Sequence, residues 1–249
     1  MMAMLRSTLH MAFMFVTVIP YTLLILLARG FGARADMRYA IAQKWLTLSI
    51  DAARVIMGIR YQVQGQDNLP VGETSPAILL VKHQSTYETF LMPAIMPHPL
   101  AYVFKKELLY VPFFGWSIGS LDMIHIDRSQ RAKAFTKVVE QGKALLDRGV
   151  WVIMFPEGTR IPRGQRGSYK SGGTRLAIAT GAPVIPVAVT SAKCWPRKAF
   201  IKHPGVVDVS IGKPIPSVGR DADELMRDVE TWIEAEMQRL DPEAYRAQH

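Results

Sequence analysis

The chain has 249 residues, 49% of them hydrophobic, a net charge of +9 and one cysteine, Cys194. This length fits one domain with attachments, and a single cysteine excludes an intrachain disulfide and fits a reducing compartment. A basic balance indicates an anionic partner such as nucleic acid, anionic lipid or a phosphorylated substrate. Because the chain has no zinc-finger spacing, RNA-recognition signature or long basic tract, we expect no nucleic-acid partner.

The N-terminal part of the chain is apolar enough to associate with a lipid bilayer. Residues 11–28 carry no charge and are just long enough to cross about 30 Å of hydrocarbon as a helix, with a kink expected at Pro20. Residues 39–59 are also largely apolar, so the two segments predict a hairpin in one leaflet or a span plus an interfacial helix. Two alternatives stay open: residues 1–35 as a cleaved signal peptide, and residues 39–59 as a core helix.

Basic residues gather after the first apolar segment rather than before it. They are Arg29, Arg34, Arg38 and Lys44. By the positive-inside tendency, the domain that follows stays in the cytoplasm. We therefore expect residues 1–60 to anchor the chain to the inner (cytoplasmic) membrane, with residues 61–249 as a domain that faces the cytoplasm.

From residue 61 onward, short apolar runs alternate with amphipathic segments, a pattern typical of an α/β domain. Strands are expected at 61–64, 77–81, 101–106, 123–126, 150–155, 183–189 and 206–211, the first and last at sheet edges. Helices are expected at 85–94, 131–148, 174–180 and 221–240. The unbroken apolar runs indicate strands covered on both faces. The expected fold is a single domain with a largely parallel or mixed central sheet flanked by helices, behind an N-terminal two-helix segment.

A histidine and a carboxylate follow the predicted strand 77–81. His83 precedes Glu88 by five positions, so the imidazole can take a proton from a hydroxyl while the carboxylate fixes its tautomer. Residues 85–88 are also a capping box, in which Glu88 accepts the backbone N–H of Ser85. A carboxylate has two oxygens, which allows both roles. No serine or cysteine nucleophile is obvious beside this pair, so the attacking hydroxyl is expected to belong to the substrate.

Basic residues at two further strand ends predict a site for a phosphate group. Arg128 follows the strand 123–126 and can clamp a phosphate through two hydrogen bonds, or pair with Asp127 at the surface. Lys105, at the end of the strand 101–106, is a second candidate, with a solvated lysine as the alternative. His125 alternates with isoleucines and is expected to be structural.

The segment Phe-Pro-Glu-Gly-Thr-Arg at 155–160 is the main candidate for a phosphate cradle, with a structural turn as the alternative. Gly158 lets the backbone approach a ligand closely. Thr159 and Arg160 supply hydroxyl and guanidinium donors. Glu157 is expected to orient Arg160 or to bind a substrate hydroxyl.

Four blocks in this order resemble the glycerolipid acyltransferase family over roughly residues 75–215. They lie at 81–88, 126–128, 155–160 and 184–187. The first block departs from the usual pattern of the family, because Glu88 stands where aspartate is usual and Lys82 where asparagine or serine is common.

The resemblance implies that residues 61–249 form an acyltransferase catalytic domain. The implied reaction moves a fatty acyl group from acyl-CoA or acyl carrier protein to the free hydroxyl of lysophosphatidic acid, giving phosphatidic acid, with another lyso-lipid as the alternative acceptor. His83 is then the general base and Glu88 its orienter. The expected phosphate contacts are Arg128, Lys105, Glu157, Gly158, Thr159 and Arg160. No cofactor and no metal ion is expected. The glycine-rich basic loop 161–173 is expected to be a mobile flap that guides the anionic acyl donor, or an ordinary solvated loop.

The sequence also suggests two competing functions. Residues 115–119 fit Gly-x-Ser-x-Gly, so Ser117 with the downstream His203 can belong to a serine hydrolase. That elbow needs a strand directly before it, and Pro112 with two phenylalanines precedes it instead. A basic membrane-anchored protein that binds anionic lipid would explain the charge and the apolar N-terminus, but not the spacing of His83 and Glu88.

Overall fold

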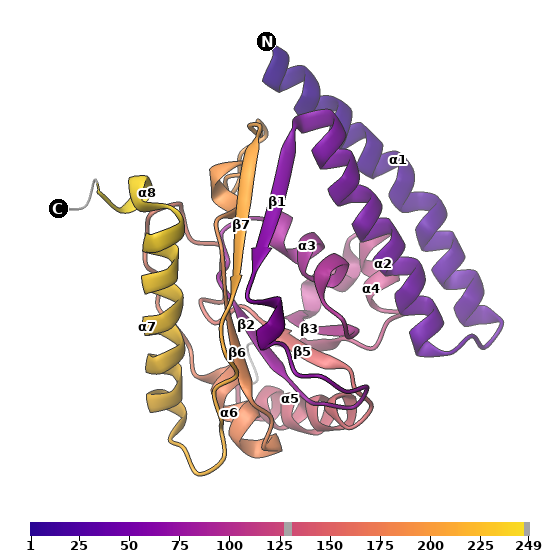
Figure 1. Ribbon diagram of the computed structural model, residues 1–249. Coiled ribbons are helices and arrows are strands. Elements are labelled where there is room, and N and C mark those ends of the chain that lie inside the picture. The colour runs from indigo at the N-terminus through magenta and orange to yellow at the C-terminus, as the bar shows by residue number, and fades with distance from the viewer. Residues whose placement is uncertain (127–130, 247–249) are drawn as a thin grey trace.

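The computed structural model describes residues 1–126 and 131–246, without the side chains of residues 131–134. In this part of the chain, a seven-stranded sheet lies between two layers of helices (Figure 1). The strand order is β1-β7-β6-β2-β5-β3-β4. Neighbouring strands are parallel except for β6 and β7. The α/β fold with a largely parallel sheet, expected from the sequence, is confirmed.

The strands agree with the expected positions to within one or two residues. They are β1 (Ile59–Gln64), β2 (Ile78–Val81), β3 (Leu100–Lys105), β4 (Ile124–Ile126), β5 (Trp151–Met154), β6 (Val184–Val189) and β7 (Gly205–Ile211).

The expectation that 206–211 is an edge strand is wrong. Strand β7 lies between β1 and β6. Its alternation has another cause, because the polar members are buried and paired rather than solvated. The buried Asp208 carboxylate accepts hydrogen bonds from the side chains of Thr190, Gln62 and Lys193. The buried Ser210 hydroxyl donates to Glu236. A strand can therefore alternate in polarity while both of its faces are covered.

The helices divide into two layers. On one face of the sheet lie α1 (Met2–Gly30), α2 (Ala35–Ala52), α3 (Tyr87–Ile95) and α4 (Phe114–Ile118); on the other lie α5 (Arg131–Leu146), α6 (Gly172–Thr180) and α7 (Ala222–Leu240) (Figure 1). Short turns complete the chain: η1 (Ala53–Met57), η2 (Gln66–Asn68), η3 (Lys106–Tyr110), η4 (Ser191–Lys193) and α8 (Pro242–Arg246).

Strand β2 shows why the sequence has an unbroken apolar run at the centre of the sheet. Leu79 and Val81 belong to the core beneath α2 and α3, whereas Ile78 and Leu80 belong to the core beneath α6 and α7. Side chains of a strand alternate between faces, so a strand with a core on each face has no polar position. This places the end of β2 at the middle of the molecule.

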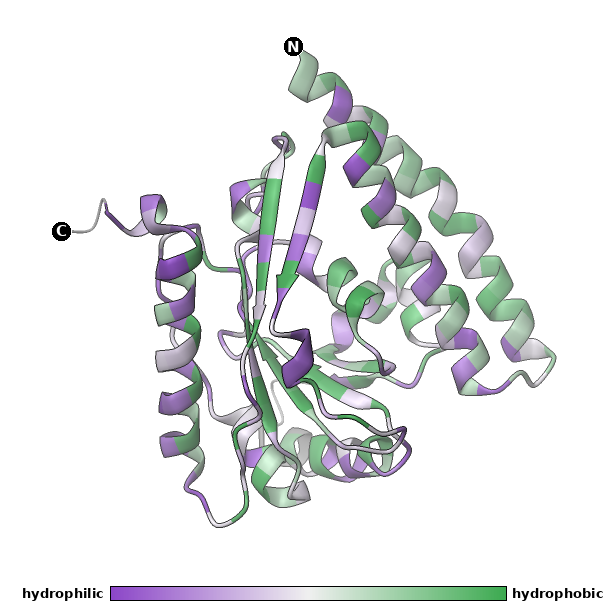
Figure 2. Cartoon of the chain, in the orientation of Figure 1, coloured by the Kyte–Doolittle hydropathy of each residue, from purple (hydrophilic) through white to green (hydrophobic). Residues whose placement is uncertain are grey.

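Helix α1 is largely apolar along its length (Figure 2), and part of its apolar surface forms a stripe that the rest of the protein leaves uncovered. Its members are Leu5, Leu9, Val16, Leu23 and Leu27, each more than half exposed. Within the described residues, α1 alone is long and apolar enough to cross a membrane, a test that a core helix or a signal sequence also passes. Pro20 lies inside this helix.

Helix α2 is held against the domain rather than standing apart from it. Trp45 and Ile50 are buried in the same core as β2 and α3. The Gln43 side chain donates to the carbonyl of Pro93 in α3, at 2.7 Å. The alternative of a core helix at 39–59 thus describes the packing of α2 well, and the division of the chain at residue 60 stays a prediction.

Candidate active site

The candidate site residues come from the carboxyl ends of three neighbouring parallel strands. Lys82 and His83 follow β2, residues 155–160 follow β5, and Lys105 is the last residue of β3. Parallel strands bring their carboxyl ends to one edge of a sheet, which is where open α/β sheets bind ligands. The topology therefore gathers segments that lie far apart in the sequence.

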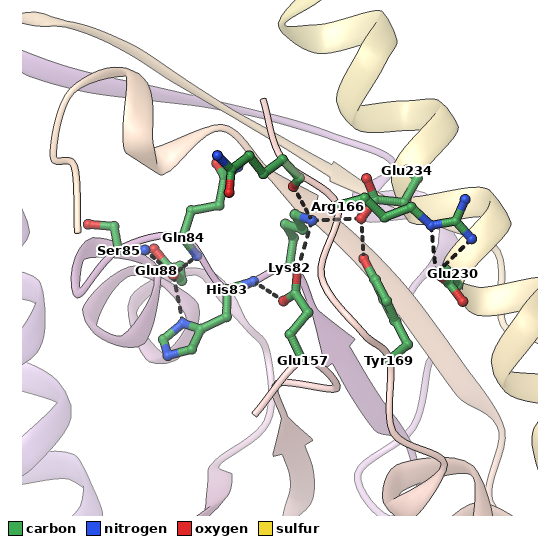
Figure 3. Close-up of polar contacts among 11 residues, drawn as sticks. Lys82, His83, Gln84, Ser85, Glu88, Glu157, Arg166, Tyr169, Glu230 and Glu234 are labelled. Carbon is green, nitrogen blue, oxygen red and sulfur yellow. Dashed lines mark hydrogen bonds and ion pairs between the residues drawn. The ribbon is translucent and has the colours of Figure 1, made fainter. Parts of the chain in front are cut away.

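His83 and Glu88 are in direct contact. The Nδ1 atom of His83 lies 2.8 Å from Oε1 of Glu88, whose side chain is fully buried (Figure 3). The imidazole also stacks on the ring of Phe155, with 3.9 Å between centroids and 15° between planes. With a proton on Nδ1 shared with the carboxylate, Nε2 is left as the acceptor. The imidazole is thus fixed in orientation, with 16% of its side chain exposed.

Glu88 also caps the turn that leads into α3. Its Oε1 atom accepts the backbone N–H groups of Gln84 and Ser85, both at 2.7 Å. The hydroxyl of Ser85 accepts the N–H of Tyr87, the first residue of the helix. The longer side chain of glutamate therefore reaches the histidine and the backbone together, so the orienting contact and the capping contacts coexist as the sequence allowed.

The turn after β5 presents its donors beside His83. Gly158 has a φ of 66°, a backbone conformation that residues other than glycine adopt only with strain. Nη1 of Arg160 donates to Oγ1 of Thr86 at 2.8 Å, which ties this turn to the start of α3. The exposed Thr159 follows the glycine.

A cavity of about 510 Å³ joins these groups. Its polar end is lined by His83, Thr86, Lys105, Gly158, Thr159 and Arg160. Its apolar part is lined by residues of α1, α2, α3 and β3, among them Ile25, Trp45, Leu46, Phe90 and Val103. The cavity thus combines a polar mouth that contains an imidazole with an apolar space that suits a hydrocarbon chain.

The structure corrects the expected position of Glu157. Its side chain is fully buried, and it neither contacts Arg160 nor lines the cavity. Instead, Oε1 lies 2.8 Å from Nζ of Lys82, and Oε2 accepts the backbone N–H of His83 at 2.8 Å. Burial raises the pKa of the Glu157 carboxyl, and the Lys82 ammonium and the His83 N–H oppose that rise. Glu157 therefore holds the backbone of His83 and does not face the cavity.

Sequence reasoning missed the buried cluster around Lys82. Its ammonium is fully buried and lies 2.6 Å from Oε1 of Glu234, on α7 (Figure 3). The hydroxyl of Tyr169 donates to the same oxygen at 2.7 Å. The unusual lysine was visible in the sequence, but its partner on α7 lies more than 150 positions away and beyond the blocks of the resemblance. No local pattern signals that contact.

The loop 161–173, expected to be a mobile flap or an ordinary solvated loop, has two arginines that contact carboxylates near the C-terminus. Arg163 forms two hydrogen bonds of 2.7 Å with the carboxylate of Asp241, and Arg166 pairs with Glu230 of α7 at 2.8 Å. Neither arginine lines the cavity. The backbone N–H of Lys170 also donates to the carbonyl of Pro156. The basic side chains of this loop fasten it to the C-terminal part of the chain.

The sequence singles out two further residues, Arg128 and His125. Arg128, with Asp127, lies outside the described residues, so its role stays a prediction. Nε2 of His125 lies 2.9 Å from Nζ of Lys137 in α5, at the sheet edge formed by β4. Within the described ranges, no group of three or more His, Cys, Asp or Glu side chains is arranged to hold a metal ion.

The serine that fits a hydrolase motif lies in a different setting from a nucleophile elbow. Ser117 is in α4, which follows the turn η3 and not a strand. Its Oγ atom lies 2.8 Å from Oγ1 of Thr22 in α1, whereas the exposed His203 follows η4 before β7. The strand–turn–helix geometry that activates such a serine is absent at this position.

Comparisons with known proteins agree with this geometry. A family model described as Acyltransferase matches residues 60–190. The 1-acyl-sn-glycerol-3-phosphate acyltransferase of Pseudomonas aeruginosa is 42% identical over 219 residues, 87% of this chain and 83% of that protein. The alpha form of the enzyme with that name in Mus musculus is 29% identical and matches 73% of this chain and 64% of its own length.

A solved structure extends the likeness to nearly the whole chain. The crystal structure of the 1-acyl-sn-glycerophosphate (LPA) acyltransferase from Thermotoga maritima has a TM-score of 0.79 at 26% sequence identity, and the match covers 95% of both chains. The N-terminal helices and α7 lie outside the residues that the family model matches, but this structural match covers most of them as well. By sequence and by fold, this chain belongs to the acyltransferase family.

Proposed function

We propose that this protein is a 1-acyl-sn-glycerol-3-phosphate acyltransferase, which transfers a fatty acyl group from a thioester to lysophosphatidic acid and produces phosphatidic acid. The carrying observation is the contact between His83 and Glu88 at the polar mouth of an apolar cavity, with Arg160 and Lys105 on the same mouth. The acyltransferase names of the Pseudomonas aeruginosa and Thermotoga maritima relatives support the choice of acceptor.

In the proposed reaction, Nε2 of His83 takes the proton of the free glycerol hydroxyl. The oxygen then attacks the thioester carbonyl, the carbon–sulfur bond breaks, and the departing thiolate receives the proton from the imidazolium. Glu88 accepts a hydrogen bond from Nδ1–H of His83 and stabilises the positive charge that forms on the ring. A well-placed general base of this kind contributes about 10²–10⁴ in rate. The products are phosphatidic acid and the free thiol of CoA or acyl carrier protein.

The phosphate of the acceptor is proposed to bind Arg160 and Lys105. Arg160 is already oriented by its hydrogen bond to Thr86, and Lys105 is exposed at the cavity mouth. A phosphate held there would place the neighbouring hydroxyl against His83, which converts a bimolecular encounter into an oriented one. Arg128 is proposed as a third contact from its position after β4. The apolar part of the cavity is proposed to take an acyl chain.

The uncovered stripe of α1 is proposed to associate with the lipid bilayer. Basic residues after α1 favour a catalytic domain on the cytoplasmic side of the inner membrane. Four residues of α1 line the cavity: Val18, Tyr21, Thr22 and Ile25. The proposed membrane helix is therefore also a wall of the proposed active site, which suits substrates that reside in the bilayer.

The test uses purified wild type, His83→Ala and Ser117→Ala with acyl-CoA and lysophosphatidic acid in mixed micelles, and measures thiol release with formation of phosphatidic acid. We expect wild-type activity to survive in Ser117→Ala and to fall about 10²–10⁴-fold in His83→Ala. Background release from wild type and His83→Ala alike would contradict the proposed chemistry. Replacing the acceptor with lysophosphatidylcholine tests the head group, and equal rates with both acceptors would contradict phosphate recognition.

A further inference from the structure

Lys82 is a charged side chain enclosed in the protein interior, directly before the proposed general base. Its ammonium donates to a carboxylate oxygen of Glu234 at 2.6 Å and to the carbonyl of Gln165 at 3.4 Å, and forms an ion pair with a carboxylate oxygen of Glu157 at 2.8 Å. A buried ammonium is tolerated only with such pairing. The lysine thus joins the turn after β5, the loop 161–171 and helix α7 at one point.

Glu157 connects this cluster to the backbone of His83. One carboxylate oxygen pairs with Lys82, and the other accepts the N–H of His83 at 2.8 Å. The carbonyl of His83 accepts the N–H of Ile161 at 2.8 Å, from the same segment. Both backbone polar groups of His83 are therefore held by residues 157–161, and the position of this segment depends on the pairing of Glu157 with Lys82.

We propose that Lys82 and Glu234 are positioning residues for His83, and that helix α7 is through them a working part of the active site. The inference rests on the acyltransferase function proposed above and extends it. The matched family segment ends at residue 190, so Glu234 lies outside it. In the resembled family asparagine or serine is common in place of Lys82, and a side chain that short would not span from β2 to α7. The coupling is thus specific to chains that carry this lysine.

Breaking the cluster is expected to change the position of His83. Without Lys82, two buried carboxylates lose their shared cation, so Glu157 must reorient or take up a proton. Either change weakens its bond to the N–H of His83. An error of about 1 Å in the position of a catalytic group can cost roughly 10²-fold in rate. Arg160 keeps its separate hydrogen bond to Thr86, and Lys105 belongs to β3, so the proposed phosphate contacts are less affected than His83 and the loss should appear mainly in kcat.

The experiment compares substitutions at two positions that lie one turn apart on the same face of α7. Glu234→Leu removes the partner of Lys82, Glu234→Gln keeps an acceptor there, and Glu230→Leu is the matched control. Glu230 lies one turn earlier on α7 and pairs with Arg166, which is exposed. Lys82→Met and the double variant Lys82→Met/Glu234→Leu complete the set. For each full-length variant, kcat and KM for both substrates are measured per folded molecule, together with the midpoint of thermal unfolding.

We expect kcat to fall roughly 10- to 100-fold in Lys82→Met and by a smaller factor in Glu234→Leu, with KM within about twofold of wild type. Glu234→Gln should recover most of the rate, and Glu230→Leu should match wild type. The double variant should be no slower than Lys82→Met, because removing Glu234 relieves the uncompensated charge.

Several outcomes would overturn the proposal. Wild-type kcat per folded molecule in Lys82→Met, or in Glu234→Leu where the first variant does not fold, would show that the cluster serves stability alone. A raised KM at unchanged kcat would place Lys82 in substrate binding instead. Equal losses in Glu234→Leu and Glu230→Leu would mean that α7 acts generally. A wild type without acyl transfer would instead refute the proposed function itself.

Discussion

Arg160 and Thr86 hold the two walls of the cavity mouth together through one hydrogen bond, with Nη1 of the guanidinium 2.8 Å from Oγ1 of the threonine. Arg160 comes from the turn after β5, and Thr86 is the cap of α3. The bond uses one of the five N–H donors of the guanidinium, so the others can meet an anion. The arginine is therefore fixed in direction before any substrate arrives.

The first prediction follows from that orientation. Arg160→Ala should raise KM for lysophosphatidic acid, because a charge-assisted hydrogen bond of about 1.5–3 kcal/mol corresponds to roughly 10- to 150-fold in kcat/KM. Steady-state kinetics with varied acceptor checks it. The control is Arg166→Ala, since Arg166 pairs with Glu230 away from the cavity. An unchanged KM in Arg160→Ala would remove this residue from the phosphate site.

A second prediction separates the two roles of Glu88. Glu88→Gln keeps an oxygen for the N–H groups of Gln84 and Ser85 but loses the charge that stabilises the imidazolium. Activity per folded molecule should therefore fall roughly 10²-fold or more while the fold is retained. Initial rates combined with far-UV circular dichroism measure both quantities. Loss of stability with intact activity of the folded fraction would mean that capping is the main role of Glu88.

A third prediction concerns the apolar part of the cavity. Ala42 of α2 lines it, so Ala42→Trp should fill the space and lower kcat/KM more for long acyl donors than for short ones. A series of acyl-CoA chain lengths measures the change in preference. Ala40→Trp is the control, because Ala40 is exposed on the same helix. A uniform loss across all chain lengths would argue against this cavity as the acyl site.

A fourth prediction tests the uncovered stripe of α1. Leu9→Asp combined with Leu23→Asp places two charges on this stripe and should move the protein from the membrane to the soluble fraction. Sedimentation with lipid vesicles reports the partition. Val71→Asp with Val218→Asp is the control, since both valines are exposed apolar residues away from α1. Equal vesicle binding by both double variants would shift the membrane contact to another surface.

The strands and helices could be predicted because their signals are local. The apolar run of β2 follows from burial on both faces of the sheet. The recurrence of Leu225, Val229 and Ile233 at every fourth position follows from burial of one face of α7. The place of β7 in the sheet could not be predicted, because a buried Asp208 paired with Thr190 has the same letter as a solvated one. A central strand with buried, paired polar residues has the same sequence pattern as an edge strand.

The candidate site divides along the same line. His83 and Glu88 are five residues apart, so their contact follows from one turn of chain. Glu157 also belongs to a recognised block, but its direction depends on the ammonium of Lys82, and that in turn depends on Glu234 of a distant helix. The arginines of the loop 161–173 likewise find carboxylates near the C-terminus. Ion pairs between residues far apart in the chain produce no periodic pattern in the sequence, so they could not be predicted.

The inner edge of α1 carries polar side chains that are completely covered: Ser7, His10 and Thr22. If α1 were rotated by half a turn about its axis, these polar groups would be exposed to hydrocarbon, which costs roughly several kcal/mol. In the proposed association of α1 with a bilayer, the rotation of the protein about this helix is therefore fixed, with the uncovered stripe toward the lipid and the residues that line the cavity toward the domain.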